Sequence, residues 1–389
     1  MTKLDELIQE LCPDGVEFVS MNELLKRKQI STITPTIKVK RNDYLDIGET
    51  TIISQEIEYI SGYCNFHDKN IPCGNYVCFG DHSEHIKYIN FSFVQGADGL
   101  KIMRTNESTI SSRYLFHALS SKYQRHNNYE RHFKYLTDTI IPVPPLPVQR
   151  EIVRILDNFT ELTAELTAEL TARKKQYAYY RDKLLTHSSE TKICKLADVC
   201  ESIADGDHMP PPKADDGIPF ITISNITEQN KIDFSNTMFV PSSYYDALAD
   251  KRKPHSGDIL YTVVGSYGIP VCIEQDTKFV FQRHIAILRP RSEVIKARYM
   301  FHAMQSGAFK AQADKAAKGA AQKTIGLSSL AEMTLPVPDM CIQERLIHVL
   351  DNFDAICTDL NIGLPAEIEA RQKQYEYYRD KLLSFEEKT

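Results

Sequence analysis

Two long stretches of the chain, 142–185 and 336–383, carry the pattern of amphipathic helices behind a proline-rich connector. Each stretch opens on Pro-Val-Pro, an extended element that cannot continue a helix and therefore marks a domain boundary. Apolar and aromatic residues then recur three and four positions apart, which is the spacing of a coiled-coil seam. The first stretch also contains ELTAELTAELTA at 161–172, a strict period of four. The pattern predicts two long helices with matching seams.

The seam positions can be read from both copies. In the first helix they are Ile152, Ile155, Phe159, Leu162, Leu166, Leu170, Tyr177, Tyr180 and Leu184. In the second they are Leu346, Val349, Phe353, Ile356, Leu360, Tyr375, Tyr378 and Leu382. Because the seams match, the simplest arrangement is an antiparallel coiled coil; the alternative is two unrelated helices, each packed on its own domain. Gly363 and Pro365 interrupt the second copy, so we expect a kink or brief break there, with Pro365 opening the next helical stretch.

Short apolar runs outside these helices, divided by glycine and Asn/Asp turns, predict β-strands. Clear examples are NYVCFG at 75–80, LKIMR at 100–104, GDILYTVVG at 257–265 and HIAILRP at 284–290. The helical patterns that flank these runs are at 2–11, 112–122 and 297–313. Each half is therefore predicted to contain a mixed α/β (α+β) globular domain.

The whole chain follows one plan twice. The repeated motifs are PVPPLPVQREIVRILDNF (142–159) and PVPDMCIQERLIHVLDNF (336–353), RKKQYAYYRDKLL (173–185) and RQKQYEYYRDKLL (371–383), and RYLFHAL (113–119) and RYMFHAM (298–304). We therefore expect two tandem globular domains, each followed by a helical spacer. The boundaries we predict are 1–145 and 188–339 for the globular domains, and 146–187 and 340–389 for the spacers.

Composition narrows the class of protein. Apolar content of 42% and charged content of 25% are those of a globular protein. The chain has no run of 18 apolar residues and no signal-peptide core near its start, so we expect a cytoplasmic protein without a membrane segment, with its nine scattered cysteines reduced. The net charge of -6 argues against coating nucleic acid by bulk electrostatics. Contacts with phosphate must come from local clusters or from partner subunits.

Motifs for catalysis are absent from the sequence. It has no phosphate-binding loop, dinucleotide turn or nucleophile elbow, and no Asn/Asp-Pro-Pro-Tyr/Phe signature of a base methyltransferase. The nearest approach to a metal site is the set Cys64, His67, Cys73, Cys78, His82 and His85. Its spacing matches no regular zinc finger and the second half does not repeat it, so we predict buried thiols and turn histidines, with no metal and no cofactor in this chain.

Two turns of the second half have the chemistry to enter a DNA groove. ADGDHMPPPK at 204–213 is a rigid loop that presents His208 and Lys213. KAAKGAAQKT at 315–324 carries Gln322 between two lysines. Glutamine can pair bidentately with adenine, and lysine can reach guanine or phosphate.

The repeated Pro-Val-Pro connectors, Gln149 and Gln343 after them, the Leu-Asp-Asn-Phe turns and the QY-YYRDKLL endings resemble the specificity subunit of type I restriction-modification enzymes. The tandem TAEL resembles the central region of the subgroup that includes the EcoR124 type. KGAAQKT is similar to a Gly-x-x-Gln-Lys turn of the family's recognition domains. The first half departs from that turn and has RHNNYERHFKY at 125–135.

The resemblance implies a DNA reader without catalytic activity of its own. Each globular half would be a target recognition domain for one part of a split double-stranded DNA sequence. The paired helices would dock two methyltransferase subunits, which carry S-adenosylmethionine and recruit restriction subunits that use ATP and Mg²⁺. The residues we expect at the DNA are Lys38, Lys40, Arg41, Asn127, Asn128 and Arg131 in the first domain, and His208, Lys213, Tyr267, Lys318, Gln322 and Lys323 in the second.

Helix length agrees with such a spacer. A helix over 151–185 is about 52 Å long, and successive major grooves on one face of DNA lie about 34 Å apart. One TAEL tetrad adds about 6 Å to the length of the helix and about 40° of rotation about its axis. In the heptad pattern such an insertion of four residues acts as a stutter. We interpret the tetrad as an adjustment of helix length; the alternative is that it only fills the helix.

Two other functions of the chain stay open. One is an adaptor that bridges two ligand-binding domains without nucleic acid, and the other is an enzyme with an unrecognised active site.

Overall fold

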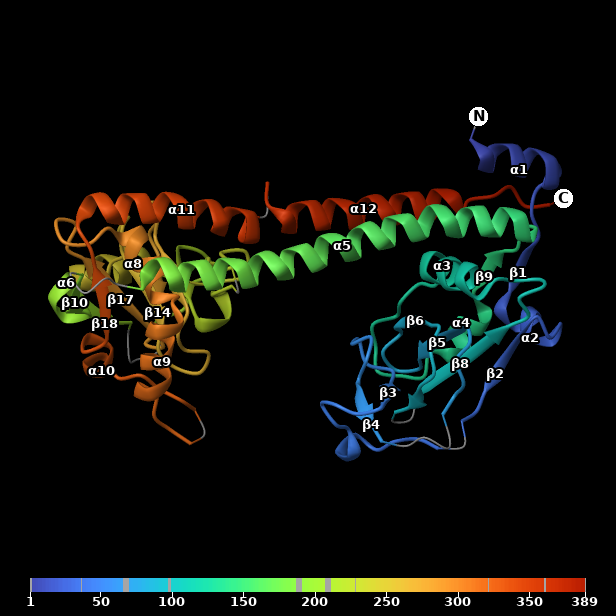
Figure 1. The fold of residues 1–389 in the computed structure, drawn as a ribbon, viewed down its shortest axis with the longest axis horizontal. Helices are drawn as coiled ribbons and strands as arrows, with labels where there is room; N and C mark the ends of the chain where they lie inside the picture. Colours follow the sequence, from blue (N-terminus) through green and yellow to red (C-terminus); the bar gives the residue numbers. More distant parts are fainter. Residues whose placement is uncertain are drawn as a thin grey trace. The chain divides into compact units, whose positions relative to one another are not determined.

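The computed structural model describes residues 2–35, 37–65, 70–96, 99–186, 191–206, 211–227, 229–320, 322–359 and 362–388. The chain divides into two compact units, Met1–Glu165 with Ile368–Thr389, and Leu166–Glu367 (Figure 1). Each unit combines a globular segment with parts of the long helices. Over the described ranges, no helix is long and apolar enough to cross a membrane.

The first unit is built on a four-stranded antiparallel sheet. Its order is β2 (Ile30–Ile33), β8 (Leu100–Thr105), β5 (Tyr76–Gly80) and β6 (Ile86–Ile89). A smaller sheet has the order β4 (Gly62–Cys64), β3 (Thr50–Ile53) and β7 (Val94–Gln95), and β1 (Phe18–Ser20) pairs with β9 (Ile140–Pro142). The helices are α1 (Lys3–Leu11), α2 (Met21–Lys26), η1 (Arg41–Asp43), α3 (Ser112–Lys122) and α4 (Phe133–Asp138), with parts of α5 (Leu146–Leu185) and α12 (Leu364–Leu382).

The second unit has the same construction. Its main sheet has the order β11 (Cys200–Asp205), β17 (Ile285–Pro290), β14 (Ile259–Thr262) and β15 (Pro270–Cys272). The smaller sheet has the order β13 (Met238–Val240), β12 (Ile218–Ile221) and β16 (Val280–Phe281), and β10 (Lys192–Lys195) pairs with β18 (Thr334–Val337). The helices are α6 (Leu196–Val199), η2 (Ile223–Asn225), α7 (Ser242–Ala247), η3 (Asp250–Arg252), α8 (Ala297–Met304), α9 (Gly307–Ala316), α10 (Leu327–Ala331) and α11 (Met340–Thr358), with the rest of α5.

The two units correspond strand for strand. In both, the main sheet is antiparallel, and the small sheet contains one parallel pair at the same place, β3 with β7 and β12 with β16. This correspondence confirms the predicted mixed α/β class and the internal repeat.

Alternation along the central strands explains where each core lies. Strand β5 is buried throughout. Val77 and Phe79 join the core that includes α3 and the long helices, whereas Tyr76 and Cys78 join the core next to the small sheet. Because successive side chains of a strand point to opposite faces, one central strand serves both cores. In the second unit β14 does the same.

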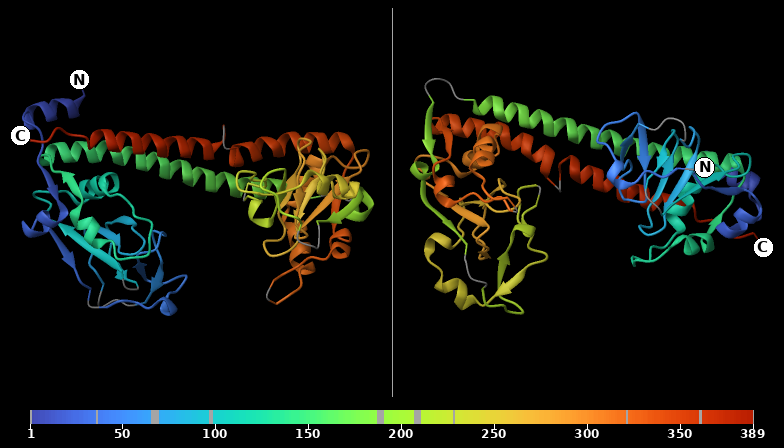
Figure 2. Two further views of the ribbon diagram at one scale, coloured as in Figure 1. Left: turned by 180° about the vertical axis from the view of Figure 1, so that it is seen from behind. Right: turned by 90° about the horizontal axis from the view of Figure 1, so that it is seen from below.

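The long helices pair antiparallel. In the first unit Phe159 of α5 stacks on Tyr378 of α12 with ring centroids 5.4 Å apart. In the second unit Tyr177 of α5 stacks on Phe353 of α11 at 6.3 Å. The partner's number falls as the number along α5 rises, and both views of Figure 2 show the paired segments side by side within each unit. The predicted antiparallel pairing is confirmed.

A break separates α11 from α12 at the predicted place. Helix α11 ends at Thr358, and α12 begins at Leu364 with Pro365 in its first turn. A Cβ on Gly363 would lie 2.6 Å from the backbone oxygens of Ala355 and Asp359, so only glycine fits this close turn. Leu360 lies outside the described residues.

The buried face of the helices differs from the predicted seam at some positions. Leu184, Val349 and Ile356 are 38%, 40% and 44% exposed, whereas the residue after each of them is buried. The reason is that each helix packs on its globular segment as well as on its partner helix, so two neighbours determine which face is covered. Buried seam residues are Ile152 and Tyr177. Half-buried ones are Ile155, Phe159, Leu162, Leu166, Leu170, Leu346, Phe353, Tyr375 and Leu382, and Tyr180 and Tyr378 lie at the exposed edge.

Candidate nucleic-acid interface

The segment between α3 and α4 of the first unit forms a loop pinned by one buried carboxylate. Glu84 is 3% exposed and follows β5 in the left-handed region, with φ of 57°. Its side chain accepts hydrogen bonds from the hydroxyl of Tyr123 at 2.6 Å and from the backbone N–H groups of His126 at 2.8 Å and Asn127 at 2.8 Å. These bonds determine the path of the loop over 123–128.

Electrostatics keeps Glu84 ionised. Burial by itself would raise the pKa of this carboxyl, but the hydrogen bonds from Tyr123, His126 and Asn127 and the nearby His132 outweigh burial and lower the pKa to about 2. A carboxylate that accepts several charge-assisted bonds is a strong anchor. At neutral pH the charged carboxylate therefore anchors the loop through these bonds.

The corresponding loop of the second unit, between α9 and α10, docks in the same way. In the first unit the N–H of His132 donates to the carbonyl of Asp81, directly after β5, at 2.8 Å. In the second the N–H of Ile325 donates to the carbonyl of Val263, directly after β14, at 2.8 Å. Since β5 and β14 correspond, the two loops occupy the same place in their units, although RHNNYERHFKY and KGAAQKT share no motif.

The second loop is closed by backbone bonds. Lys318 and Thr324 exchange both N–H to carbonyl bonds, at 2.9 and 2.8 Å. Gly319 has φ of +119° and a Cβ there would lie 2.3 Å from the carbonyl oxygen of Gln322, so the tight turn requires glycine. The N–H of Gly265 donates to the carbonyl of Lys323 at 3.0 Å. The turn after β14, which carries Tyr267, is thereby bound to the loop with Lys318, Gln322 and Lys323.

Several predicted residues of the first unit converge. Lys38 and Arg131, far apart in sequence, line one hollow of about 480 Å³ together with Lys101 and His82. Lys101 pairs with the buried Asp81 at 3.5 Å, and Arg131 makes no ion pair with any residue of the described segments. The hollow is therefore a cationic surface beside the loop.

Other predicted residues lie elsewhere or are engaged within the protein. Arg41 pairs with Glu56 at 2.9 Å, and Lys40 is exposed; neither lines the hollow. Asn127 binds Glu84 through its backbone, and the Asn128 side chain is bonded within the loop. Lys213 is exposed beside the bridge that joins Ala214 to Phe239, and His208 lies outside the described residues.

Several residues at these loops were not predicted to contact DNA. In the first unit they are His82, Lys101 and Tyr129. In the second, Arg283 is exposed in the turn before β17. Burial lowers the pKa of its half-buried neighbour His284, and the charge of Arg283 lowers it further. Basic residues in turns are common on protein surfaces, so only the fold singles these out.

A buried histidine ties the first globular segment to the long helices. His117 of α3 is fully buried. Its Nδ1 lies 2.9 Å from the hydroxyl of Tyr375, and its Nε2 lies 3.1 Å from a carboxylate oxygen of Asp157, which also accepts from Arg113 at 2.7 Å. Burial lowers the pKa of His117, so the ring is neutral, donates through Nε2 and accepts through Nδ1.

The second unit has an equivalent joint, by which we mean the buried histidine and its partners that connect the globular segment to the long helices. His302 of α8 lies 2.9 Å from the hydroxyl of Tyr177 and 2.7 Å from Asp351, and Arg298 donates to Asp351 at 2.6 Å. The repeated motifs therefore encode the joint: Arg and His in RYLFHAL and RYMFHAM, Asp in Leu-Asp-Asn-Phe, and Tyr in the endings. Each histidine contacts one long helix from its own half of the sequence and one from the other half.

Gln149 and Gln343 make a second set of contacts that is repeated in the two units. Gln149 accepts from the N–H of Ser111, at the start of α3, at 2.9 Å, and Gln343 accepts from the N–H of Lys296, at the start of α8, at 2.9 Å. Each amide group also donates to two backbone carbonyls. The buried glutamines therefore fix the start of the long helix against the globular segment.

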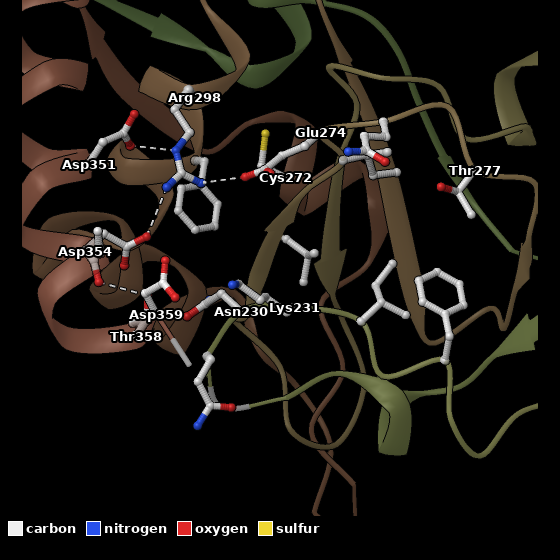
Figure 3. A pocket seen from close by; sticks show the side chains of 18 of the residues that line it. Asn230, Lys231, Cys272, Glu274, Thr277, Arg298, Asp351, Asp354, Thr358 and Asp359 are labelled. Carbon is white, nitrogen blue, oxygen red and sulfur yellow. Dashed lines mark hydrogen bonds and ion pairs between the residues drawn. The ribbon is translucent and has the colours of Figure 1, made fainter. Parts of the chain in front are cut away.

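The surface beside the joint differs between the units. In the second, a pocket of about 640 Å³ lies between β15 and α11, where Arg298 also pairs with Asp354 at 3.0 Å and Glu274 at 3.7 Å (Figure 3). The equivalent pocket of the first unit, about 510 Å³, is lined by basic rather than acidic residues, among them Lys87, Arg113 and Arg125. The two halves share the joint but present opposite charge at the same place.

The cysteine and histidine set of the first half forms no metal site in the part of the chain that the structure describes, where no group of three or more possible ligands gathers. Cys64 and Cys78 are buried. His67 lies outside the described residues.

Comparison with known proteins identifies the family. The profile of the "Type I restriction modification DNA specificity domain" matches residues 13–173 and 188–370, one copy in each half. The chain is 30% identical over 427 aligned residues to the type I restriction enzyme EcoR124I/EcoR124II specificity subunit of Escherichia coli, covering 99% of this chain and 97% of that protein.

Two solved structures share the fold. One is the S subunit of the type I restriction-modification system from M. genitalium, with a TM-score of 0.53 and 13% identity over 95% of this chain and 96% of that one. The other, from work on complex assembly and conformational transition of the type I R-M system, has a TM-score of 0.57 and 16% identity over 95% of this chain and 98% of that one. The duplicated fold, the duplicated loops and the two profile matches together lead to one conclusion: the chain belongs to the DNA specificity subunits of type I restriction-modification systems, the non-catalytic component of these enzymes.

Proposed function

We propose that each unit reads one half of a split, asymmetric double-stranded DNA target. The observation that carries this proposal is the pair of loops, which dock on corresponding strands through the same backbone bond but have unrelated sequences. A duplicated scaffold with different loops suits a reader whose two half-sites differ. Phosphate contacts position a protein on DNA, whereas contacts with base edges specify the sequence.

Local charge supports the proposal. The chain is acidic overall, with a net charge of -6. Cations nevertheless gather at both loops, Lys38, Lys101 and Arg131 in the first unit and Lys318 and Lys323 in the second. In the proposed interface these cations contact phosphates, and Gln322 contacts a base edge. We retain Lys40, Arg41, Asn127, Asn128, His208, Lys213 and Tyr267 as proposed contributors.

We further propose that the long helices dock two methyltransferase subunits. The support is a line of exposed aliphatic residues on α11, Ile342, Val349 and Ile356, which are 47%, 40% and 44% exposed and seven residues apart. Residues seven apart lie on one helix face, and an apolar face left in water suits a partner helix. The predicted seam residues Val349 and Ile356 would then pack against the partner subunit.

We assign the cofactors of the complex to the partner subunits. S-adenosylmethionine belongs to the methyltransferase subunits, and ATP with Mg²⁺ belongs to the restriction subunits. The proposed recognition domains are 1–145 and 188–339, and the proposed spacers are 146–187 and 340–389. Helix length then determines the gap between the half-sites.

A mobility-shift experiment tests the function. The full chain is mixed with its methyltransferase partner and a duplex that carries the split sequence methylated in cells expressing both. We expect a shift that disappears when either half-site is scrambled and that weakens with added salt, because phosphate contacts release counterions. If no split duplex is shifted, the adaptor alternative gains support. Methyl transfer by the chain alone would contradict the non-catalytic role.

A further inference from the structure

We infer that Tyr129, stacked on His82, is the residue with which the first recognition domain contacts a base edge, at the position that Gln322 occupies in the second domain. The inference rests on the proposed function and identifies a specificity residue within it. It begins from the shared docking of the two loops. His132 and Ile325 make the same backbone bond to the residue after the central strand, and Tyr129 and Gln322 each lie three residues before that bond.

A second bond supports the correspondence. The residue after Tyr129 is Glu130, whose carbonyl accepts from the Nδ1 of His82 at 2.9 Å. The residue after Gln322 is Lys323, whose carbonyl accepts from the N–H of Gly265 at 3.0 Å. In both units, therefore, the turn that follows the central strand holds the loop one residue beyond the position in question.

Tyr129 is presented to solvent on a loop that several hydrogen bonds hold. Its side chain is 91% exposed, which is the largest value among the exposed large apolar and aromatic side chains of the described segments. Its ring lies on the ring of His82 with centroids 5.2 Å apart and an interplanar angle of 16°. His82 is held by its bond to Glu130, and the loop before Tyr129 is held by Glu84. The tyrosine ring therefore stacks on a histidine that is bonded to the same loop, yet stays almost wholly open to solvent.

An aromatic side chain held in this way is suited to recognition. A large ring that is exposed in the free protein can be buried against a partner. Tyrosine also has few side-chain torsions, so little conformational entropy is lost when a partner immobilises it. Arg131 and Lys101 line the hollow beside the same loop and supply positive charge for the phosphates. The ring edge can pack on an apolar group of a base, such as the thymine methyl, whereas glutamine pairs with adenine through two hydrogen bonds. The two domains would thus read different bases by exchanging one residue at one position.

The test compares three variants of the full chain with its methyltransferase partner. Tyr129→Ala removes the ring, Tyr129→Phe keeps the ring without its hydroxyl, and Gln322→Ala is the matched variant of the other loop. The methylated sequences are determined by single-molecule sequencing in cells, and discrimination is measured by competition binding with duplexes mutated at each position.

We expect Tyr129→Ala to lose discrimination by roughly 5- to 150-fold at one or two neighbouring positions of one half-site, and to leave the other half-site unchanged. Gln322→Ala should do the reverse. Tyr129→Phe should keep the wild-type pattern, because the ring makes the contact. Because Tyr129 is 91% exposed, its replacement removes no core side chain, and an intact second half-site shows that the other unit is folded.

Three results would overturn the inference: an unaltered half-site in Tyr129→Ala, an equal loss of affinity for every duplex, or a Tyr129→Phe variant as impaired as Tyr129→Ala. These results are distinct from failure of the proposed function. If the wild-type chain directed methylation to no split sequence, the proposed function itself would fail. If the wild-type sequence is split and Tyr129→Ala leaves both halves intact, only this inference fails.

Discussion

Replacing Glu84 with glutamine isolates the anchor of the first loop. The substitution keeps the size of the side chain and removes its charge. The carboxylate accepts bonds from Tyr123, His126 and Asn127 while almost fully buried. An amide in its place has one acceptor oxygen, so it cannot serve all three donors. The loop that carries Tyr129 should therefore open more often.

The size of the effect follows from the pKa. The pKa of Glu84 falls from its ordinary value of 4.5 to about 2, and each tenfold change in proton affinity corresponds to about 1.36 kcal/mol, so the charge contributes roughly 3 kcal/mol. Because the folded pKa is below the ordinary one, this contribution is complete above about pH 5 and is lost as the pH falls toward 2. Glu84→Gln should lack the contribution throughout this range.

Hydrogen exchange at the backbone amides of His126 and Asn127 is the direct assay. At neutral pH we expect the variant to lose protection by roughly a hundredfold. The matched control is Glu17→Gln, because Glu17 pairs with Arg27 at 2.8 Å with its side chain 55% exposed, and a surface pair contributes less than about 1 kcal/mol. DNA discrimination should weaken in one half-site only. Equal protection in wild type and Glu84→Gln would refute this account of the loop.

Three further predictions concern the helices. Tyr177→Phe removes the donor to the buried His302 and should lower the free energy of unfolding, measured with denaturant, by about 1–3 kcal/mol. The control Tyr179→Phe, at a residue that is 62% exposed, should change this free energy by less than about 0.5 kcal/mol. Equal effects of the two substitutions would contradict the role given to the bond between Tyr177 and His302. Deleting Thr167–Leu170 shortens α5 by about 6 Å and turns it by about 40°, so the mapped gap between half-sites should shrink by one or two base pairs with both half-sites retained; an unchanged gap excludes the length adjustment. Val349→Asp should weaken methyltransferase binding in sedimentation velocity, and undiminished binding would remove α11 as a docking face.

Much of the architecture could be predicted because it is repeated. The helical periodicity, the connectors and the break at Gly363 are local patterns, and the structure confirms them. The edge strands β2 and β11 were not predicted, since they are rich in polar residues and their pairing with β8 and β17 depends on distant segments. The predicted helix over 297–313 is divided because Ser306 caps a new helix through its bond to the N–H of Phe309.

The candidate site was less accessible from sequence. Lys38 and Arg131 were predicted singly, but only the fold brings both to one hollow. Tyr129 was missed although its neighbours were chosen, because exposure and stacking on His82 leave no local signature. His117 was visible as part of a repeated motif, yet its link to Tyr375 spans most of the chain. Contacts between distant segments are what periodicity and composition do not encode.

We propose that two recognition domains in one chain each read one half of a split DNA sequence. The most direct measurement is genome-wide detection of methylated bases by single-molecule sequencing in cells that express the chain with its methyltransferase partner. We expect one motif made of two different half-sites separated by a gap of fixed length in which any base is accepted. A continuous motif, or methylation that does not depend on this chain, would contradict it.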